Sequence, residues 1–545
     1  MTACVIREAG DSGLLLELEE VIDARINARA IAIAAALRRE QPTGVRDVVS
    51  TYRTVAVHFD PLSVDLEVVR GAMERASTTA AADVTGKTVD VAVQYGGEVG
   101  PDLAEVAAFA GVGPEVAAAI HSDAAYRVFM LGFLPGFAYM GSVDSKIAMP
   151  RRETPRVRVP IGSVGIAGLQ TGVYPRESPG GWRLIGRTNA RVFDANRAEA
   201  CLFAPGDRVR FTPHDRLNFD RLQSTGAGRS ARGSDHASRH VTVVKPGLYT
   251  TIQDRGRWGH QADGVPVGGA LDRQSHRAAN ALVGNDTAAA TLEVTLLGPE
   301  IRFESDAVIA IGGADLGARI DGLDLKVNTP AMCRGGAVLR FGERRSGSRA
   351  YLAIDGGVDV EPVLGSRATS VLAGLGGVDG RPLAAGDRLP LGLPTRPSRV
   401  RRKVDAPPMP NGGARLRVVP GPHQEFFPDA AFDHLQRTRF IVTPRSDRMG
   451  YRLDGAPIPR LEGREMISDA AFAGGIQVPS SGDPILLMAD RQTTGGYPQI
   501  ATVITADLPL AGQLAPGDWI EFEVCSRREA LSALVAQEGR LLAIG

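Results

Sequence analysis

Lysine and cysteine are both scarce in this 545-residue sequence. Only five of its 62 basic residues are lysine and the rest are arginine. We attribute this bias mainly to genomic composition, so an individual arginine needs local context before it indicates a site. The cysteines lie far apart, with no CxxC or Cys/His ligand spacing, at Cys4, Cys201, Cys333 and Cys525. This pattern argues against a zinc site and a disulfide framework, and it favours reduced cysteines in the cytoplasm.

Net charge and long apolar runs are also lacking. The 62 basic residues balance 62 acidic ones without a long block of like charge, so nothing favours a nucleic-acid or anionic-membrane partner. The longest apolar run, residues 30–37, is far shorter than the roughly 20 residues that span a bilayer. The N-terminal MTACVIREAGDSG has no basic segment followed by an apolar stretch. We therefore expect a soluble, cytoplasmic protein whose partners are small molecules or other proteins.

The common fingerprints of nucleotide binding and covalent hydrolysis are absent. Gly86-Lys87-Thr88 resembles the end of a P-loop, but Ala81 stands where the first glycine belongs, and the triplet precedes a strand-like segment. No GxGxxG opens a βαβ unit, no HxH or HExxH pair occurs among the histidines, and there is no GxSxG elbow. We interpret the triplet as a turn, and any bound ATP would need a less familiar site.

The first 80 residues predict a small α+β lobe. Strand-like LLLEL (from Leu14) and TVAVHF (from Thr54) alternate with helical patterns at residues 24–39 and 66–76. Short connections between such elements indicate a two-layer unit, and we expect a ferredoxin-like lobe.

Residues 81–223 form a second predicted domain. They open with the strand-like TVDVAVQY, continue with helices at 102–110 and after Pro114, and end in the strand-like RVRF. The polar, glycine-rich segment 224–240 follows and lacks apolar periodicity, which predicts a linker.

The rest of the chain predicts β structure. Glycine and proline punctuate β-branched runs throughout, a pattern typical of barrels or sandwiches, and we divide it into two β-barrel halves, 241–400 and 401–545. A small-x-Gly-Asp turn followed by a strand occurs three times, in LFAPGDRVRF, LAAGDRLPL and LAPGDWIEF. This weak repeat suggests three related β units. The expected fold class is therefore α+β, mainly β.

The stretch from Arg127 to Gly186 contains the first candidate site. Glycine and proline bend its apolar GFLPGFAYMG segment around aromatic rings. Arginine forks and exposed glycine amides suit a carboxylate or phosphate, and both occur here, at Arg151, Arg152, Arg156 and Arg158 and at Ser178, Gly180 and Gly181. The alternative is a surface arginine cluster beside an ordinary turn.

A second constellation lies between Gln253 and Asp272. Asp254 and Asp272, with Arg257, flank glycine-rich backbone. Such a group could hold Mg²⁺ or orient a polar substrate. The alternative is that both aspartates cap turns.

A third constellation lies near the C-terminus. One part groups arginine with an aromatic residue, at Ser446, Arg448, Tyr451 and Arg452, and the other is polar, at Asp490, Gln492, Thr493 and Tyr497. Amide and hydroxyl groups of this kind can read an amide or lactam through hydrogen bonds. The alternative is a set of buried polar groups that close the end of a barrel.

Several of these segments resemble a known family. GFLPGFAYMG, PRRETPRVRVPIGSVGIAG and QTGVYPRESPGGWRLIGRT resemble allophanate hydrolase subunit 1, also known as the B-type component of 5-oxoprolinase, over residues 7–211. Further along, QDRGRWGHQADGVPVGGALD, SDRMGYRLDG and ADRQTTGGYPQIATVITAD resemble allophanate hydrolase subunit 2, the C-type component of 5-oxoprolinase. The resemblance implies a fusion of both components and cyclophilin-like barrels.

The resemblance also implies an activity. It suggests the B and C components of an ATP-dependent 5-oxoprolinase, which opens 5-oxo-L-proline to L-glutamate with a separate A-type subunit. The expected cofactors are ATP and Mg²⁺. In this interpretation Asp254 or Asp272 would coordinate magnesium, and Gln492 would form a hydrogen bond with the lactam. The catalytic candidates are then Arg158, Asp254, Asp272 and Gln492. The binding candidates are Arg151, Arg152, Gln170, Tyr174, Ser178, Gly180, Gly181, Gln253, Arg257, Arg448, Tyr451, Thr493 and Tyr497.

Two other functions stay open. The same modules form the carboxyltransferase part of urea carboxylase, although this chain has no AMKM-like sequence, so we expect no covalently attached biotin. A related pair is described as the inhibitor of a sensor kinase and its antagonist, but fusing the two at fixed stoichiometry would defeat that switch. The sequence leaves open the metal ligands, the exact substrate and whether the chain forms a homo-oligomer.

Overall fold

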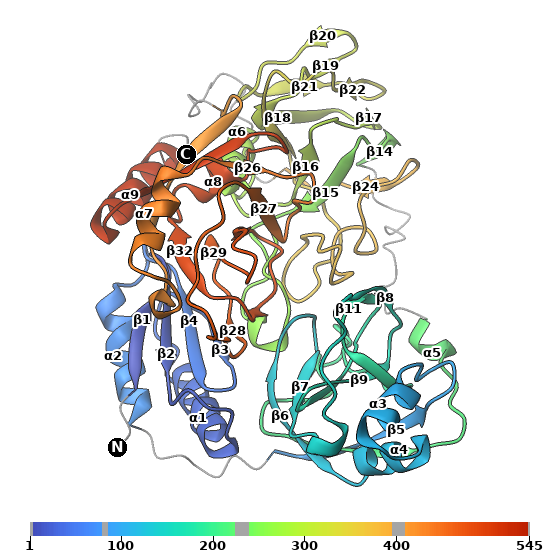
Figure 1. The fold of residues 1–545 in the computed structure, drawn as a ribbon. Helices are drawn as coiled ribbons and strands as arrows, with labels where there is room; N and C mark the ends of the chain where they lie inside the picture. The colour runs from blue at the N-terminus through green and yellow to red at the C-terminus, as the bar shows by residue number, and fades with distance from the viewer. Residues whose placement is uncertain (1–3, 79–85, 224–238, 395–408, 543–545) are drawn as a thin grey trace.

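The computed structural model describes residues 4–78, 86–223, 239–394 and 409–542. Ala81 and most of the predicted linker, residues 224–238, lie outside the described residues. The described chain is mostly β and contains four units, which we call the N-terminal lobe, the first barrel, the two-sheet unit and the second barrel (Figure 1). The predicted α+β, mainly β fold class is confirmed.

The N-terminal lobe has two helices on one face of a four-stranded antiparallel sheet. The sheet order is β1-β2-β4-β3. Asp23 and Asp65 accept hydrogen bonds from the first turns of the two helices and so fix where these begin. Both predicted helices and both predicted strands are present, together with two strands that the sequence did not indicate. The elements are β1 Val5–Glu8, β2 Gly13–Glu17, α1 Ala24–Glu40, β3 Val45–Ser50, β4 Thr54–Phe59 and α2 Leu66–Ser77.

The first barrel closes in the order β10-β7-β6-β13-β5-β12-β9. The strands β13 and β5 pair in parallel and the other neighbours are antiparallel. Gly86 and Lys87 lead directly into β5, which begins at Thr88, and the Lys87 amide donates to Asp207 Oδ1 at 3.0 Å. The triplet thus precedes a strand, as predicted. The elements are β5 Thr88–Tyr95, α3 Leu103–Ala110, α4 Pro114–Ser122, β6 Ala125–Leu131, β7 Ala138–Gly141, η1 Ser145–Ile147, β8 Arg156–Val159, β9 Ser163–Ala167, β10 Gln170–Val173, β11 Ser178–Gly180, β12 Arg183–Arg187, β13 Arg208–Pro213 and α5 Asp220–Gln223.

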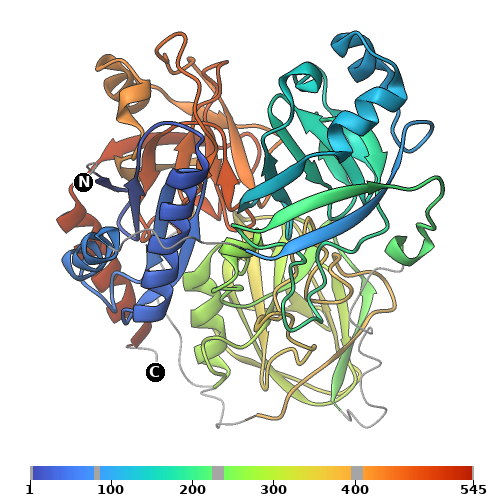
Figure 2. The same ribbon diagram turned by 90° about the horizontal axis from the view of Figure 1, so that it is seen from below.

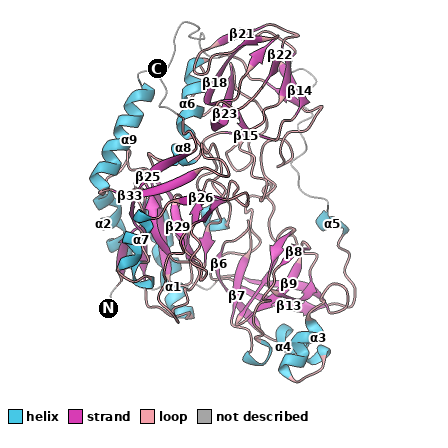
Figure 3. Cartoon of the chain, turned by 45° about the horizontal axis from the view of Figure 1, so that its top comes forward, coloured by secondary structure: helices cyan, strands magenta, loops and turns pink. Residues whose placement is uncertain are grey.

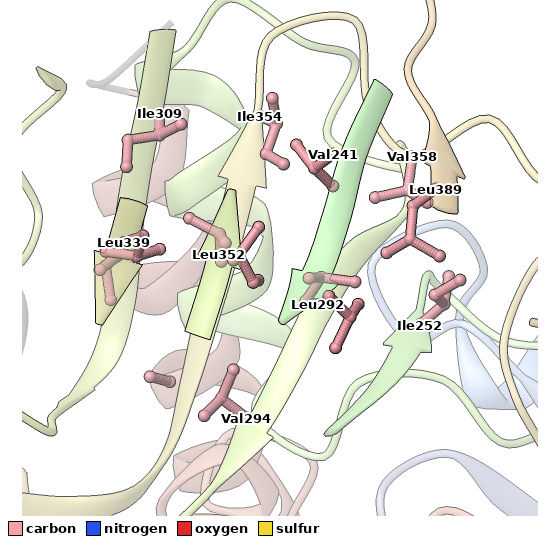
Figure 4. Packing of buried hydrophobic residues seen from close by; sticks show 14 of the residues in the cluster. Val241, Ile252, Leu292, Val294, Ile309, Leu339, Leu352, Ile354, Val358 and Leu389 are labelled. Atoms are coloured by element: carbon pink, nitrogen blue, oxygen red, sulfur yellow. The ribbon is translucent and has the colours of Figure 1, made fainter. Parts of the chain in front are cut away.

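The two-sheet unit packs a six-stranded sheet, β20-β19-β22-β17-β14-β24, and a five-stranded sheet, β15-β16-β23-β18-β21, around one apolar core. Figure 4 shows aliphatic side chains from both sheets meeting in this core, among them Val241, Leu292 and Leu352. The elements are β14 His240–Lys245, β15 Tyr249–Gln253, η2 Gln261–Asp263, α6 Arg273–Leu282, β16 Thr291–Thr295, β17 Glu300–Phe303, β18 Ala307–Asp315, β19 Arg319–Ile320, β20 Leu323–Asp324, β21 Ala331–Cys333, β22 Val338–Arg340, β23 Ser346–Ile354 and β24 Arg388–Pro390.

The second barrel closes in the order β25-β32-β29-β30-β27-β26-β33. Its parallel pair joins β25 to β33. In Figure 3, α3 and α4 lie at the outer end of the first barrel, and α9 lies along the outside of the second. The elements are β25 Gly413–Pro420, η3 Gln424–Phe426, α7 Ala430–Arg437, β26 Phe440–Val442, β27 Gly450–Asp454, β28 Asp469–Ala470, β29 Gly475–Gln477, β30 Ile485–Leu487, β31 Thr494–Gly495, β32 Gln499–Val503, α8 Leu508–Ala511, β33 Trp519–Val524 and α9 Arg527–Leu542.

The predicted Gly-Asp repeat marks the same turn in three units. Asp207, Asp387 and Asp518 each accept a hydrogen bond from the backbone amide three residues earlier, at 2.8, 2.7 and 2.8 Å. The glycine before each aspartate has φ between 90° and 99°, a conformation that favours glycine. Each turn leads directly into β13, β24 or β33.

The N-terminal lobe packs on units that follow it by hundreds of residues. Asp11 accepts from the amide and hydroxyl of Thr505 at 2.9 and 2.6 Å, and Asp47 accepts from the Gly259 amide at 2.9 Å. Phe472 of the second barrel joins an apolar cluster of lobe residues. Figures 1 and 2 both show the blue lobe beside the orange and red second barrel.

Membrane-spanning character is weak in the described residues. No single helix there is both long and apolar enough to cross a bilayer. The helices α3 and α4 pass that test only as a pair, and they meet at a bend of 90°.

Candidate functional site

A cleft of about 1600 Å³ lies between the first barrel and the second barrel. The first barrel lines it from β7, β10 and nearby loops, and the second from β27, β30 and the segments around them. A loop at residues 457–466 lines it as well. Residues from both the first barrel and the second barrel are therefore needed to form this site.

The first barrel lines the cleft with aromatic rings. Phe133, Tyr139 and Trp182, which we call the aromatic wall, face the cleft, and Phe137 and Tyr174 back them. The Phe137 ring centroid lies 5.4, 5.0 and 5.3 Å from those of Phe133, Tyr139 and Trp182, in edge-on geometry. Burial raises the pKa of Tyr174 to about 12 and also raises the pKa of Tyr139. Both phenols therefore keep their protons at neutral pH and can donate hydrogen bonds.

The loop before the aromatic wall is tightly constrained. Phe133 has a φ of 63°, which is uncommon for a residue with a large side chain. A Cβ on the preceding Gly132 would lie 2.0 Å from Oγ1 of Thr494, a cleft residue of the second barrel. Only glycine permits this approach, so the two barrels touch at the edge of the cleft.

The side-chain amide of Gln170, which lines the cleft, is oriented by a residue of the N-terminal lobe. Gln170 Nε2 donates to the buried Tyr52 hydroxyl at 2.7 Å, which leaves Gln170 Oε1 free to accept from a ligand. The backbone around Tyr52 is fixed by Asn27, whose Nδ2 donates to the carbonyls of Thr51 and Phe129 at 3.0 Å each. The N-terminal lobe thus contributes to the cleft through Tyr52.

The cleft is lined by more positive than negative groups. Its charged side chains are five arginines and three carboxylates, namely Arg151, Arg445, Arg452, Arg460, Arg464, Asp447, Glu462 and Glu465. Arg460 and Arg464 donate to backbone carbonyls, and Asp447 accepts from two amides of its own turn. Within the described parts of the chain, the side chains of the other three arginines make no hydrogen bond or ion pair. The cleft is thus suited to anionic ligands.

Four of the predicted site residues line this cleft. Arg151 and Gln170 come from the first barrel, and Gln492 and Tyr497 come from the second. The sequence did not single out Tyr139, Trp182 or Arg445. The two aromatic residues do lie in GFLPGFAYMG and SPGGWRL, and that aromatic content was the available signal.

The other predicted residues of the first barrel lie outside the cleft lining. Arg158 is 76% exposed and pairs with Glu177 at 2.6 Å. Arg152 pairs with Asp102 at 3.4 Å, and its amide donates to the Gly181 carbonyl. Tyr174, Ser178 and Gly180 lie behind the aromatic wall, where a Cβ on Gly180 would lie 2.4 Å from the Tyr174 hydroxyl. This glycine is needed for ring packing.

The second constellation consists of buried groups that bind one another. Asp254 accepts from the amides of Gly256 and Arg367 and from the Ser366 hydroxyl. Asp272 accepts from Ser275 and Gln513 at the start of α6. Both carboxylates are therefore turn and helix caps whose oxygens are occupied, and they do not fit the magnesium role. Gln253 and Arg257 are also buried and donate to backbone carbonyls.

Part of the third constellation is buried in the same way. Arg448 binds Glu293 and Asp490 and donates to the Gly269 carbonyl at 2.7 Å. The Tyr451 hydroxyl accepts from Arg349 at 3.0 Å, and Thr493 is 1% exposed. Arg448 and Tyr451 join the second barrel to the two-sheet unit and do not face the cleft.

One buried group has the composition of a metal site. Glu17, His423 and Asp469 place ligand atoms within 4.8 Å of one another. However, His423 Nδ1 accepts the Gln499 amide at 3.1 Å, so a neutral ring carries its hydrogen on Nε2, the atom that faces Asp469. Arg7 and Arg53 already pair with Glu17. These residues fit a polar contact between the lobe and the second barrel better than a metal.

Both parts of the chain match one domain family. Residues 4–203 match the carboxyltransferase domain, subdomain C and D, and residues 263–524 match the carboxyltransferase domain, subdomain A and B. The chain also resembles TTHA0988, a solved crystal structure, with a TM-score of 0.82 and 35% identity over 95% of this chain and 100% of that one.

Relatives match each part separately. The chain is 41% identical to the C-type 5-oxoprolinase component of Escherichia coli K12, over 55% of this chain and 95% of that protein. It is 38% identical to the B-type 5-oxoprolinase component of Bacillus subtilis, over 38% of this chain and 91% of that protein. It is 33% identical to urea amidolyase of Saccharomyces cerevisiae, over 55% of this chain but 17% of that protein. The chain therefore belongs to the carboxyltransferase-domain family that includes the B and C components of 5-oxoprolinase, and it joins both types in one polypeptide.

Proposed function

We propose that this chain is the combined B and C component of an ATP-dependent 5-oxoprolinase and that the cleft between its barrels binds the cyclic amide. The observation that carries the proposal is the cleft itself, which combines an aromatic wall, three glutamine amides and unpaired arginines. The similarity to the B and C components of other 5-oxoprolinases supports the choice of substrate. An A-type subunit would be the protein partner.

The residues of the cleft suit 5-oxoproline. The five-membered ring can pack on the aromatic wall, since apolar surface is the main source of binding energy for small ligands. Gln170 can accept from the lactam N–H, because Tyr52 already occupies its Nε2. Arg151 can bind the carboxylate through two parallel hydrogen bonds. Gln492 and Tyr497 line the same cleft and can donate to the lactam oxygen.

The reaction requires an activated amide, because a lactam is a poor electrophile. In the proposed scheme, the lactam oxygen attacks the γ-phosphorus of ATP, the bond to the bridging oxygen breaks, ADP leaves, and the lactam nitrogen loses its proton. Water then adds to the ring carbon and the C–N bond breaks, which gives glutamyl phosphate. A second water releases phosphate and L-glutamate. Hydrogen-bond donors at the lactam oxygen and at the phosphoryl group would stabilise the charge that develops there.

The test measures two products separately. The purified chain is incubated with ATP and 5-oxo-L-proline, with and without an A-type subunit, and ADP and glutamate are both followed. Glutamate that appears only with both proteins supports the proposal, and ADP from this chain alone assigns the phosphorylation step to it. R151A should raise the KM for 5-oxoproline, whereas R319A, which changes an exposed arginine paired with Asp324 in the two-sheet unit, should not.

A second function is favoured by the match to carboxyltransferase subdomains and to a urea amidolyase. In that reaction the cleft would receive a carboxyl group from carboxybiotin and transfer it to urea or a similar amide. If neither ADP nor glutamate forms with 5-oxoproline, the same preparation should be assayed with carboxybiotin and urea.

A further inference from the structure

We propose that Arg445 and Arg452 form a subsite for the phosphate chain of a nucleoside triphosphate, on the side of the cleft opposite the aromatic wall. The identification of that nucleotide as ATP rests on the proposed function. The subsite itself is argued from the geometry and charge of the second barrel.

The two arginines lie on one rigid hairpin, Arg445 in its loop and Arg452 in the strand β27. The loop joins β26 to β27, and the Thr443 amide donates to the Arg452 carbonyl at 3.0 Å to close it. The Ser446 hydroxyl bridges the two limbs, since it accepts from the Arg452 amide at 3.0 Å and donates to the Arg452 carbonyl at 3.3 Å. Asp447 fixes the tip by accepting from the amides of the next turn. The backbone under both arginines is therefore organised before any ligand binds.

Neither guanidinium has a partner among the residues that the structure describes. By contrast, the guanidinium group of Arg448, on the same loop, binds two carboxylates and one backbone carbonyl. Asp447, the acid nearest to Arg445 in sequence, accepts from the amides of its own turn. Two unpaired guanidinium groups therefore line the cleft, and an anion with several acceptor oxygens can accept hydrogen bonds from both.

The size of the cleft favours a second ligand. A volume of about 1600 Å³ exceeds the roughly 300–1000 Å³ that commonly holds one drug-sized molecule, and a five-membered lactam is smaller still. Arg151, from the first barrel, is available for the carboxylate of such a lactam. The Arg445 and Arg452 pair is then left for a ligand of higher negative charge, and a triphosphate chain fits that requirement.

Equilibrium binding can test the subsite without turnover. Inorganic tripolyphosphate and ATP are titrated by calorimetry into the native chain, into R445A/R452A, and into the control R437A, which changes an exposed arginine of α7 beside Asp433. We expect the double variant to bind both ligands about 10- to 100-fold more weakly, as the loss of charge-assisted hydrogen bonds predicts. R437A should bind like the native chain. R445Q/R452Q repeats the test with polar side chains of similar length, and unchanged melting temperatures show that folding is intact.

A parallel titration with 5-oxoproline and 2-pyrrolidinone separates this inference from the proposed function. 2-Pyrrolidinone is the same lactam without the carboxylate. If the double variant no longer binds 5-oxoproline but still binds tripolyphosphate, the arginines bind the substrate carboxylate and the inference is overturned. It is also overturned if the native chain binds no tripolyphosphate, or if the variants bind it normally. If tripolyphosphate binding depends on the arginines while no glutamate forms in the assay, the subsite stands and the oxoprolinase function fails.

Discussion

The first and second barrels have the same topology, strand for strand. β5, β6, β7, β9, β10, β12 and β13 take the same places in one barrel that β25, β26, β27, β29, β30, β32 and β33 take in the other. Each barrel also carries a two-stranded ribbon, β8 with β11 or β28 with β31. The cleft lies between equivalent strands, yet the first barrel presents mainly aromatic rings and the second presents mainly arginines. A shared scaffold thus positions two different chemistries, and function cannot be deduced from topology alone.

The difference extends to stability. The rings of the aromatic wall pack on one another and on buried neighbours, so they belong partly to the core of the first barrel. The guanidinium groups of Arg445 and Arg452 touch no partner within the described residues. We therefore expect the first wall to affect folding and binding together, and the second to affect binding alone.

The largest expected effect is the loss of stability on replacing Arg448, a buried arginine in the loop that also carries Arg445. R448A leaves the carboxylates of Glu293 and Asp490 buried without their partner, and breaking such an ion pair costs about 3–5 kcal/mol. We expect a lower melting temperature by calorimetry, with R452A as the matched exposed control. Equal melting temperatures for the two variants would contradict the division between structural and cleft arginines.

The next effect is a pH dependence of stability, to which His121 of the first barrel contributes. His121 is buried and contacts the hydroxyls of Tyr95 and Thr171 at 2.8 and 2.9 Å, and burial lowers its pKa to about 3. The unfolded chain takes up a proton below pH 6.5 whereas the folded chain does not, so stability falls as pH drops from about 6.5 toward 3. At pH 5 the loss is about 2 kcal/mol. Burial also lowers the pKa of His58 in the lobe to about 3 and that of His276 in the two-sheet unit to about 4.

Melting temperatures measured between pH 7 and pH 5 check this expectation. H121Q removes the titrating group, so its melting temperature should fall less steeply with acid, even if it is lower overall. A variant with the same slope as the native chain would show that other groups cause the acid sensitivity.

The two sides of the cleft can be compared directly with W182A and R445A. Trp182 is partly buried among Phe137, Tyr139 and Tyr174, so its removal should cost roughly 2 kcal/mol, less than for a fully buried ring. R445A, at an exposed position, should stay within about 0.5 kcal/mol of the native chain. Denaturant unfolding of the two variants side by side tests this, and a large loss for R445A would mean that the loop depends on it.

The smallest effect tests the equivalence of the barrels themselves. Asp207 and Asp518 occupy the same repeat turn, and D207A or D518A should each cost about 1–2 kcal/mol through lost hydrogen bonds to backbone amides. Similar shifts in melting temperature would support the shared turn. A shift in only one variant would show that the two turns differ in energetic weight.

The sequence predicted those parts of the fold that depend on local pattern. The helices of the lobe and the Gly-Asp turns were readable because spacing, capping aspartates and glycine conformation act within a few residues. The strand β3 was not, since its VRDVVS carries charges and its position at the sheet edge is set by pairing with β4. The closing of the barrels also depends on pairs over 100 residues apart, such as Arg208 with Thr88.

The site was harder to predict for the same reason. Arg448 and Arg452 look alike in sequence, but Glu293, 155 residues away, binds the first and not the second. For Asp254 and Asp272 the sequence left both a metal site and turn caps open, and their hydrogen-bond donors, from Ser366 and Gln513, favour the caps. Gln492 was predicted from the polar pattern around it and Gln170 from the family resemblance, and their placement in one cleft follows from how the barrels meet.

The two walls of the cleft lie some 300 residues apart in one chain, from Phe133 to Trp182 and from Arg445 to Tyr497. Their meeting is therefore an intramolecular event, governed by an effective local concentration that dilution does not change. The interface between them can be polar and modest in area without coming apart at low protein levels. One gene product also supplies both walls in equal number, so neither can be made without the other.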